Sequence, residues 1–166
     1  MAGISFPTDL ENYMSARLSF TVSGNLIPGQ SSLIMRSKNT PRVLYIEDHE
    51  DTRELVTLVL EQRSYEVVTG ATIESGIALA ASQEFDLYLL DSWLPDGSGL
   101  DLCRQIREFD KATPILFYSA AAYEIDKAQA INSGAQAYLI KPSQPSELCN
   151  LVASLIESHR RYSIAV

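Results

Sequence analysis

The sequence contains no long hydrophobic run and only two cysteines. No apolar stretch approaches the roughly 20 residues that a membrane-spanning helix needs. The N-terminus lacks the basic start and apolar core of a secretory signal. Cys103 and Cys149 are far apart and each lies in a helical pattern, so they match neither a disulfide framework nor a metal-binding spacing. We therefore expect a cytoplasmic protein with two buried thiols and no membrane contact.

Positive charge is also scarce. The chain has 13 Lys and Arg against 21 Asp and Glu, a net charge of −8, which disfavours direct binding to nucleic acid or anionic lipid. The small basic cluster His159-Arg160-Arg161 is better explained as a complement to a helix C-terminus. No glycine-rich phosphate loop follows any strand, and there is no internal repeat. A length of 166 residues with 46% hydrophobic residues fits one folded domain.

The first 40 residues differ from the rest of the chain. Apolar residues are scattered there without a sustained period, which predicts a poorly ordered N-terminal extension over 1–40; only 10–20 shows a weak helical pattern. Met35 is a plausible alternative start, and we hypothesise that translation begins there, which the intact mass of the native protein would test. Residues 41–162 form the predicted domain, followed by a short tail over 163–166.

Within the predicted domain, short apolar runs alternate with helical patterns, which is typical of a parallel sheet covered by helices on both sides. Strands are expected at 43–46, 65–69, 87–91, 115–119 and 137–140. Helices are expected at 52–63, 73–83, 100–109, 124–133 and 145 to about 160. Thr72, Gly134 and Pro145 are a cap, a stop and a start signal for three of these helices. The residues expected on two inward helix faces are Leu55, Val56, Val59 and Leu60 in the first, and Leu102, Cys103, Ile106 and Phe109 in the third.

Polar side chains follow four of the five predicted strands. In a parallel sheet all carboxyl ends lie at one edge, where ligands of such folds bind. The residues delivered there are Glu47, Asp48, Asp91, Ser119 and Lys141. Each alone has an ordinary explanation, since Asp91 could simply cap a turn, but the joint occurrence predicts a site.

Three clustered carboxylates repel one another. At about 4 Å and an effective dielectric near 20, each pair costs about 4 kcal/mol, so cations should offset the charge. Lys141 supplies one, and Mg²⁺, which prefers a few carboxylates plus water and phosphate oxygens, supplies more. An Asp nucleophile with a metal and a Lys is suited to phosphoryl transfer onto Asp91, and the Ser119 hydroxyl could bind the same phosphoryl oxygens.

These residues resemble the receiver domain of two-component response regulators. The resemblance covers about 42–160 and rests on Glu47-Asp48, the 91–97 segment Asp-Ser-Trp-Leu-Pro-Asp-Gly, Ser119-Ala120 and Lys141-Pro142. It implies a flavodoxin-like (βα)5 doubly wound sandwich with strand order 2-1-3-4-5. It also implies that Asp91 accepts a phosphoryl group from a histidine kinase or phosphotransfer protein. The magnesium ligands would be Asp48, Asp91 and the backbone carbonyl of Trp93, with Glu47 acting through water.

The resemblance further assigns a switch. Lys141 and Ser119 would contact the phosphoryl group, and the Tyr138 ring would follow the movement of Ser119. The fourth helix, fifth strand and fifth helix would then present a changed face to a partner, as a shift between two packings. The sequence departs from the family in having Glu47 for the usual Asp and Ser119 for the usual Thr, and the bulky Trp93 could shield the site.

The favoured function is therefore a single-domain response regulator, a signalling protein rather than an enzyme, which only assists its own phosphorylation and dephosphorylation. It would act on an unidentified effector protein by direct contact, with a phosphorylation-linked dimer as one possibility. The alternative is an interaction module of the same fold that works without phosphate. A phosphatase of the dehalogenase type is disfavoured, because Trp93 stands where its general acid would be and cannot transfer a proton.

Overall fold

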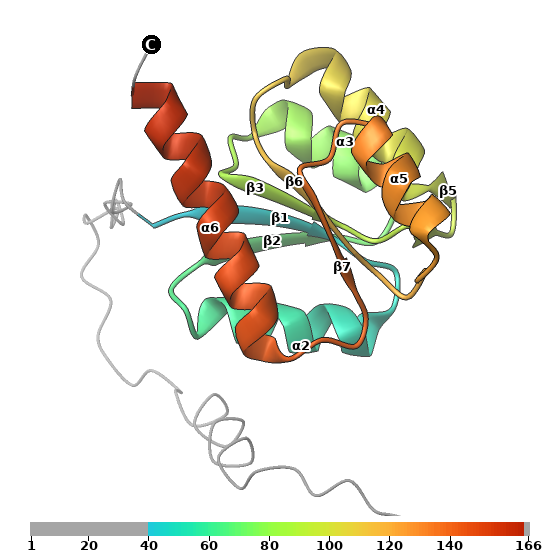
Figure 1. The fold of residues 1–166 in the computed structure, drawn as a ribbon, viewed down its shortest axis with the longest axis horizontal. Coiled ribbons are helices and arrows are strands. Elements are labelled where there is room, and N and C mark those ends of the chain that lie inside the picture. The colour runs from blue at the N-terminus through green and yellow to red at the C-terminus, as the bar shows by residue number, and fades with distance from the viewer. Residues whose placement is uncertain (1–39, 165–166) are drawn as a thin grey trace, which may run out of the picture. The chain divides into compact units, whose positions relative to one another are not determined.

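The structure is a computed structural model and describes residues 40–164. The expected N-terminal extension and the start proposed at Met35 lie outside the described residues, and the domain boundaries stay predictions. Within the described range, five parallel strands form one sheet in the order β2-β1-β3-β6-β7 (Figure 1). Counted along the sheet's own strands this is 2-1-3-4-5, which confirms the predicted topology. The strands are β1 (Arg42–Ile46), β2 (Glu66–Gly70), β3 (Leu87–Leu90), β6 (Ile115–Ser119) and β7 (Ala137–Ile140).

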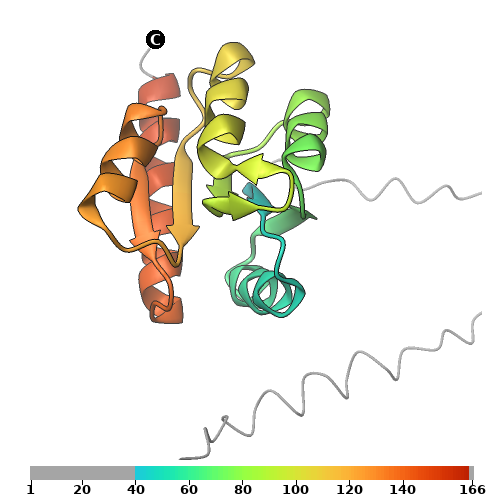
Figure 2. The ribbon, with the colours of Figure 1, turned by 90° about the vertical axis from the view of Figure 1, so that its right-hand side faces the viewer.

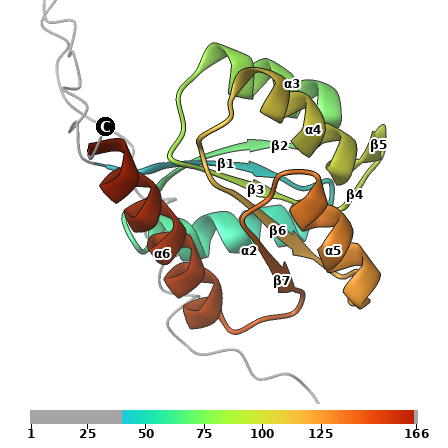
Figure 3. The ribbon, with the colours of Figure 1, turned by 45° about the horizontal axis from the view of Figure 1, so that its top comes forward.

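Helices cover both faces of the sheet (Figure 3). On one face lie α2 (Glu50–Glu61) and α6 (Pro145–Ile164), and on the other lie α3 (Ile73–Ser82), α4 (Gly99–Phe109) and α5 (Glu124–Asn132). Each face has its own apolar cluster, because successive strand residues point to opposite sides. Leu44 and Ile46 of β1 enter the α3–α4–α5 cluster, whereas Val43 and Tyr45 enter the α2–α6 cluster.

Local sequence signals determine several helix ends as predicted. The Thr72 side chain accepts a hydrogen bond from Ser75 N at 3.1 Å and caps α3. Gly134 has a φ of +108° and follows Ser133, the C-cap of α5, and α6 begins at Pro145. Cys103 and Cys149 are both buried free thiols, which confirms the expectation for them. No helix between residues 40 and 164 combines the length and apolarity needed to cross a membrane.

A small antiparallel hairpin follows β3 where only a loop was predicted. Its strands are β4 (Trp93–Leu94) and β5 (Gly97–Ser98), which stand beside α4 in Figure 2. Gly97 has a φ of +147°, a conformation that favours glycine. The Asp96 carboxylate between the strands accepts hydrogen bonds from the backbone N–H groups of Ile73 and Glu74 at 2.8 and 3.1 Å, and these bonds lower the pKa of Asp96. The hairpin is thereby attached to the N-terminus of α3.

Two predicted core residues are on the surface. Leu55 is 56% exposed and Phe109 is 49% exposed. In α2 only Val56 and Leu60 are buried, so the inward stripe is narrower than the periodicity suggested. Phe109 is the last residue of α4, where the helix ends against solvent.

Two helices differ in length from the prediction. Helix α2 begins two residues earlier, with Glu50 and Asp51 in its first turn, where acidic side chains are favourable. Helix α6 extends to Ile164.

An ionic network closes the edge of the sheet where the strands begin. The Asp86 carboxylate accepts a hydrogen bond from Arg42 N at 2.7 Å through one oxygen and bonds from the Arg160 guanidinium at 2.8 and 3.1 Å through the other. The Arg42 side chain also pairs with Glu66 at 2.9 Å. Arg160 therefore binds a carboxylate from the β3 side of the fold, instead of only complementing the end of α6 as the sequence suggested.

Candidate functional site at the carboxyl edge of the sheet

Three carboxylates meet where β1 and β3 end. Glu47, Asp48 and Asp91 each place one carboxylate oxygen within 4.8 Å of the others. The two strands are neighbours, and Asp91 N continues their pairing by donating to Ile46 O at 3.0 Å. Glu47 and Asp91 are buried, while Asp48 is exposed at the rim. The predicted convergence of acidic groups from separate strand ends is thus present.

Lys141 brings a positive charge into the carboxylate cluster from the end of β7. Its ammonium donates to Glu47 Oε2 and lies 3.5 Å from Asp91 Oδ1. The same nitrogen is 5.3 Å from the centre of the Tyr118 ring. Lys141 N donates to Ser119 O at 2.8 Å, which continues the pairing of β6 and β7 up to this residue. The lysine therefore contacts two of the three acidic side chains, and Glu47 more closely than Asp91.

The two oxygens of Asp91 have different surroundings. Oδ1 accepts a hydrogen bond from Ser92 N at 2.8 Å and faces Lys141. Oδ2 accepts no hydrogen bond from any described residue, 40–164. Oδ1 therefore orients the carboxylate, while Oδ2 has no hydrogen-bond donor among residues 40–164.

Two neighbours of the acidic cluster were not predicted. The Tyr45 hydroxyl donates to Glu47 Oε2 at 2.8 Å. The Arg53 guanidinium of α2 donates to the backbone carbonyl of Glu47 at 2.7 Å and to that of Asp48 at 3.2 Å. Tyr45 stands two residues before Glu47, on the same face of a strand, so the spacing contained this signal. For Arg53 no comparable signal exists, because its reach depends on the angle at which α2 leaves the loop.

A close backbone contact supports the loop that carries Asp91. A Cβ atom built on Gly99, the first residue of α4, would lie 1.9 Å from the carbonyl oxygen of Asp91. Gly99 N also donates to Ser92 O at 2.9 Å. The helix can approach this loop so closely only because residue 99 has no side chain.

Ser119 and Tyr138 are linked through the loop between β6 and α5. Ser119 is fully buried, and its hydroxyl oxygen accepts a hydrogen bond from Ala121 N at 3.4 Å. The Tyr138 hydroxyl donates to Ala121 O at 2.6 Å, and its ring stacks on Phe117 with centroids 6.1 Å apart. Ala121 therefore contacts both residues of the predicted switch.

The donor atoms of the acidic cluster fit a hard divalent cation. They are carboxylate oxygens only, from Glu47, Asp48 and Asp91, and one of the three side chains is open to solvent. Mg²⁺ takes such oxygen ligands and keeps several waters, which the exposed rim at Asp48 allows. Trp93, whose carbonyl the family pattern adds to this set, is 68% exposed.

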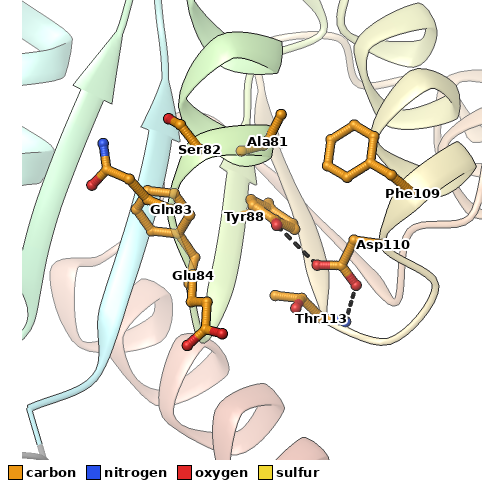
Figure 4. Close-up of a pocket in the computed structure, with 10 residues that line it drawn as sticks. Ala81, Ser82, Gln83, Glu84, Tyr88, Phe109, Asp110 and Thr113 are labelled. Carbon is orange, nitrogen blue, oxygen red and sulfur yellow. Dashed lines mark hydrogen bonds between the residues drawn. The ribbon is translucent and has the colours of Figure 1, made fainter.

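A separate hollow of about 560 Å³ lies at the other edge of the sheet, between the C-terminal ends of α3 and α4 (Figure 4). None of the predicted site residues lines it. Its wall contains Tyr88, whose hydroxyl donates to Asp110 Oδ2 at 2.9 Å. Asp110 Oδ1 accepts hydrogen bonds from the backbone N–H groups of Ala112 and Thr113 at 2.9 and 3.0 Å. Burial alone would raise the pKa of Asp110, but these bonds outweigh it and lower the pKa to about 2.

We expect the Asp110→Asn variant to unfold with a free energy about 1 kcal/mol lower at neutral pH, a value reduced for the solvent screening of a partly exposed group. Because the folded-state pKa lies below the unfolded one, the carboxylate stabilises the fold above about pH 4 and loses this effect as the pH falls toward about 2. Urea unfolding at pH 7 and pH 3 checks this, with Asp101→Asn as control, because Asp101 is an exposed carboxylate that pairs with Arg104. A difference between wild type and Asp110→Asn that stays the same at both pH values would contradict it.

The parallel five-stranded sandwich, with acidic side chains and a lysine at the carboxyl edge, defines a flavodoxin-like receiver fold. The chain belongs to the response regulator receiver domain family of two-component signalling, whose family model matches residues 43–153. The transcriptional regulatory protein ResD of Bacillus subtilis (strain 168) is 33% identical over 122 residues, which cover 74% of this chain and 50% of ResD.

Solved structures agree with the family assignment. A CheY-like response regulator receiver domain protein from Methanospirillum hungatei JF-1 superposes with a TM-score of 0.71 at 25% identity, covering 74% of this chain and 98% of that one. The receiver domain of the sensor histidine kinase PA1611 from Pseudomonas aeruginosa PAO1, solved with a magnesium ion coordinated in its active site cleft, has a TM-score of 0.67 at 26% identity, covering 70% and 98%. The chain spans about half the length of the curated relatives it matches, so the single-domain regulator stays a prediction.

Proposed function

We propose that this receiver domain accepts a phosphoryl group on Asp91 from a histidine kinase or a phosphotransfer protein. The observation that carries the proposal is the arrangement around Asp91. Its Oδ1 is held by Ser92 N and faces Lys141 at 3.5 Å, while its Oδ2 accepts no hydrogen bond within residues 40–164. A carboxylate with one oriented and one free oxygen, next to a cation, is suited to act as a nucleophile.

In the proposed step, an oxygen of Asp91 forms a bond to phosphorus while the bond from phosphorus to the donor histidine nitrogen breaks, and the imidazole keeps the electron pair. Lys141 neutralises charge on the phosphoryl oxygens, and the Ser119 hydroxyl donates a hydrogen bond to one of them. Asp48, Asp91 and the Trp93 carbonyl would hold Mg²⁺, with Glu47 acting through water, and the ion would supply further positive charge at the same oxygens. The residues thus share the task of stabilising an anionic transition state.

Phosphorylation would change the surface formed by α5, β7 and α6, where a partner protein would bind. When the Ser119 hydroxyl turns to a phosphoryl oxygen, it gives up its bond to Ala121 N, and the loop that also holds Tyr138 is released. The new charge thereby biases a packing equilibrium at the start of α5. Exposed apolar side chains, Ile125 and Ile131, lie on α5 and would meet an effector protein. That effector, a phosphorylation-linked dimer and the absence of direct nucleic-acid contact stay predictions.

The experiment that tests the proposal is incubation with acetyl phosphate and Mg²⁺, followed by intact-mass measurement. We expect wild type to gain the mass of one phosphoryl group and Asp91→Asn to gain none, because its amide is not a nucleophile. Asp101→Asn, which changes an exposed carboxylate on α4, should still gain it. If wild type gains no mass with either acetyl phosphate or a phosphorylated phosphotransfer protein, the interaction module that works without phosphate becomes the better reading.

A further inference from the structure

Tyr45 is a buried polar residue that the proposed step does not use. It is the fourth of the five residues of β1 and has no exposed surface, and it lies among the apolar side chains between the sheet and the α2–α6 layer. A hydroxyl in such a place is costly unless it is hydrogen-bonded. Within residues 40–164 the Tyr45 hydroxyl has one hydrogen-bond partner, the carboxylate of Glu47, which accepts at 2.8 Å.

The oxygen that Tyr45 binds is the one that also binds Lys141. Glu47 Oε2 accepts from the Tyr45 hydroxyl and from the Lys141 ammonium. Two donors on one oxygen hold both the carboxylate and the lysine in place. Oε1 of Glu47 accepts no hydrogen bond from residues 40–164, so it remains able to face a cation or its water.

Glutamate needs such support more than aspartate would. Its side chain has one more rotatable bond, so a larger loss of conformational freedom accompanies its ordering. Without the tyrosine, the Glu47 carboxylate could turn, and Lys141 would follow it or move onto Asp91, which is 3.5 Å away. Either movement changes the distribution of charge around the nucleophile. Burial and the charge of Glu47 raise the pKa of Tyr45 far above its ordinary value, so its hydroxyl remains a donor.

We propose that Tyr45 is a positioning residue that fixes Glu47 and Lys141 relative to Asp91 and thereby sets the affinity of the acidic cluster for Mg²⁺. The inference rests on the proposed function, because it assumes that this cluster is the one that binds the metal. Partners that orient metal ligands commonly change affinity by about 10- to 100-fold when they are removed. Within residues 40–164 the Tyr45 hydroxyl is hydrogen-bonded to Glu47 and not to Asp91, so its effect passes through Glu47.

The test compares Mg²⁺ binding by wild type and Tyr45→Phe. Trp93 is the single tryptophan of the chain and lies two residues from Asp91, so its fluorescence reports binding at this site, and titration calorimetry gives an independent dissociation constant. We expect Tyr45→Phe to bind Mg²⁺ about 10-fold more weakly. In the Glu47→Gln background the same substitution should have little further effect, because interacting residues are not additive.

Tyr88→Phe is a matched control. It removes another hydroxyl from a buried tyrosine of the same sheet that donates to a carboxylate, Asp110 at 2.9 Å, but at the opposite edge. A general loss of packing would affect both variants, whereas positioning affects only Tyr45→Phe. Tyr88→Phe should therefore retain the wild-type affinity for Mg²⁺.

If Tyr45→Phe does not fold, NMR of the wild-type protein tests the same proposal. With tyrosines labelled with carbon-13 at Cζ and assigned through backbone connectivities, Mg²⁺ should shift the Tyr45 signal and leave the Tyr88 signal in place. A folded Tyr45→Phe with unchanged Mg²⁺ affinity, or an unmoved Tyr45 signal at saturating Mg²⁺, overturns the role of Tyr45 alone. A wild-type protein that neither binds Mg²⁺ nor gains a phosphoryl group overturns the proposed function and this inference together.

Discussion

Replacement of Lys141 by methionine is expected to lower the rate of Asp91 phosphorylation by about 100- to 1,000-fold, the usual cost of losing one charge-stabilising donor in an active site. The ammonium is 3.5 Å from Asp91 Oδ1 and mostly buried, so water cannot replace it well. The substitution also leaves Glu47 buried next to Asp91 without its cation, which should lower the free energy of unfolding by about 3 kcal/mol. The rate is measured with acetyl phosphate and intact mass, on protein shown by circular dichroism to be folded.

Lys127→Met is the control for this substitution. Lys127 pairs with Glu124 three residues away on the surface of α5, and exposed pairs of this kind contribute only about 0.3–0.5 kcal/mol. Its loss should leave the phosphorylation rate unchanged. If Lys141→Met and Lys127→Met were phosphorylated equally fast, Lys141 would have no part in the transfer.

Substitution of Gly99 by alanine is expected to destabilise the domain by about 3 kcal/mol, the upper end of the range typical of overpacking, because the atoms that the methyl group meets cannot yield. The added methyl carbon would meet the Asp91 carbonyl oxygen at 1.9 Å, and the nearest atoms, in Asp91 and Ser92, all belong to the backbone. To relieve the clash, the start of α4 must move away from the loop after β3. Because that loop carries Asp91, phosphorylation should slow in whatever fraction remains folded. Urea unfolding measures the loss of stability.

Gly76→Ala in α3 provides the comparison. A Cβ atom there would meet side-chain atoms of Leu102 at 3.0 Å and Ile46 at 3.2 Å, which can adjust. Alanine also favours the helix over glycine by about 0.5–1 kcal/mol, so the net change should be small. Equal stability of Gly99→Ala and wild type would mean that α4 does not approach the loop closely enough to exclude a methyl group at residue 99.

The sequence was sufficient to predict the convergence of acidic groups, because parallel strands place their carboxyl ends together whatever the details of packing. Only the strand ends had to be located correctly, and short apolar runs marked them. The residues placed in this way were Glu47, Asp48, Asp91 and Lys141. The strand order came from the family resemblance. Contacts between side chains were harder to predict from the sequence, since they depend on rotamers and on the tilt of neighbouring elements.

Three misses illustrate that limit. The two-residue spacing of Tyr45 and Glu47 is compatible with a hydrogen bond between them, but a tyrosine in a buried strand is equally typical of an ordinary core residue. Leu55 fits a helical stripe by period, yet lies on the solvent side because the contact between α2 and the sheet is narrow. The hairpin around Asp96 depends on contacts with α3 from more than 20 residues away, which local turn signals do not contain.

The carboxylate of Asp86 has a consequence for the engineering of this domain. Because it holds both the beginning of β1, through Arg42 N, and the last part of α6, through Arg160, residues 42 and 160 are neighbours in space. A unit whose entry and exit lie together can be inserted into a loop of a host protein without separating the two sides of that loop. The domain is thus suited to circular permutation, with a short linker from residue 160 to residue 42 and new ends in another surface loop.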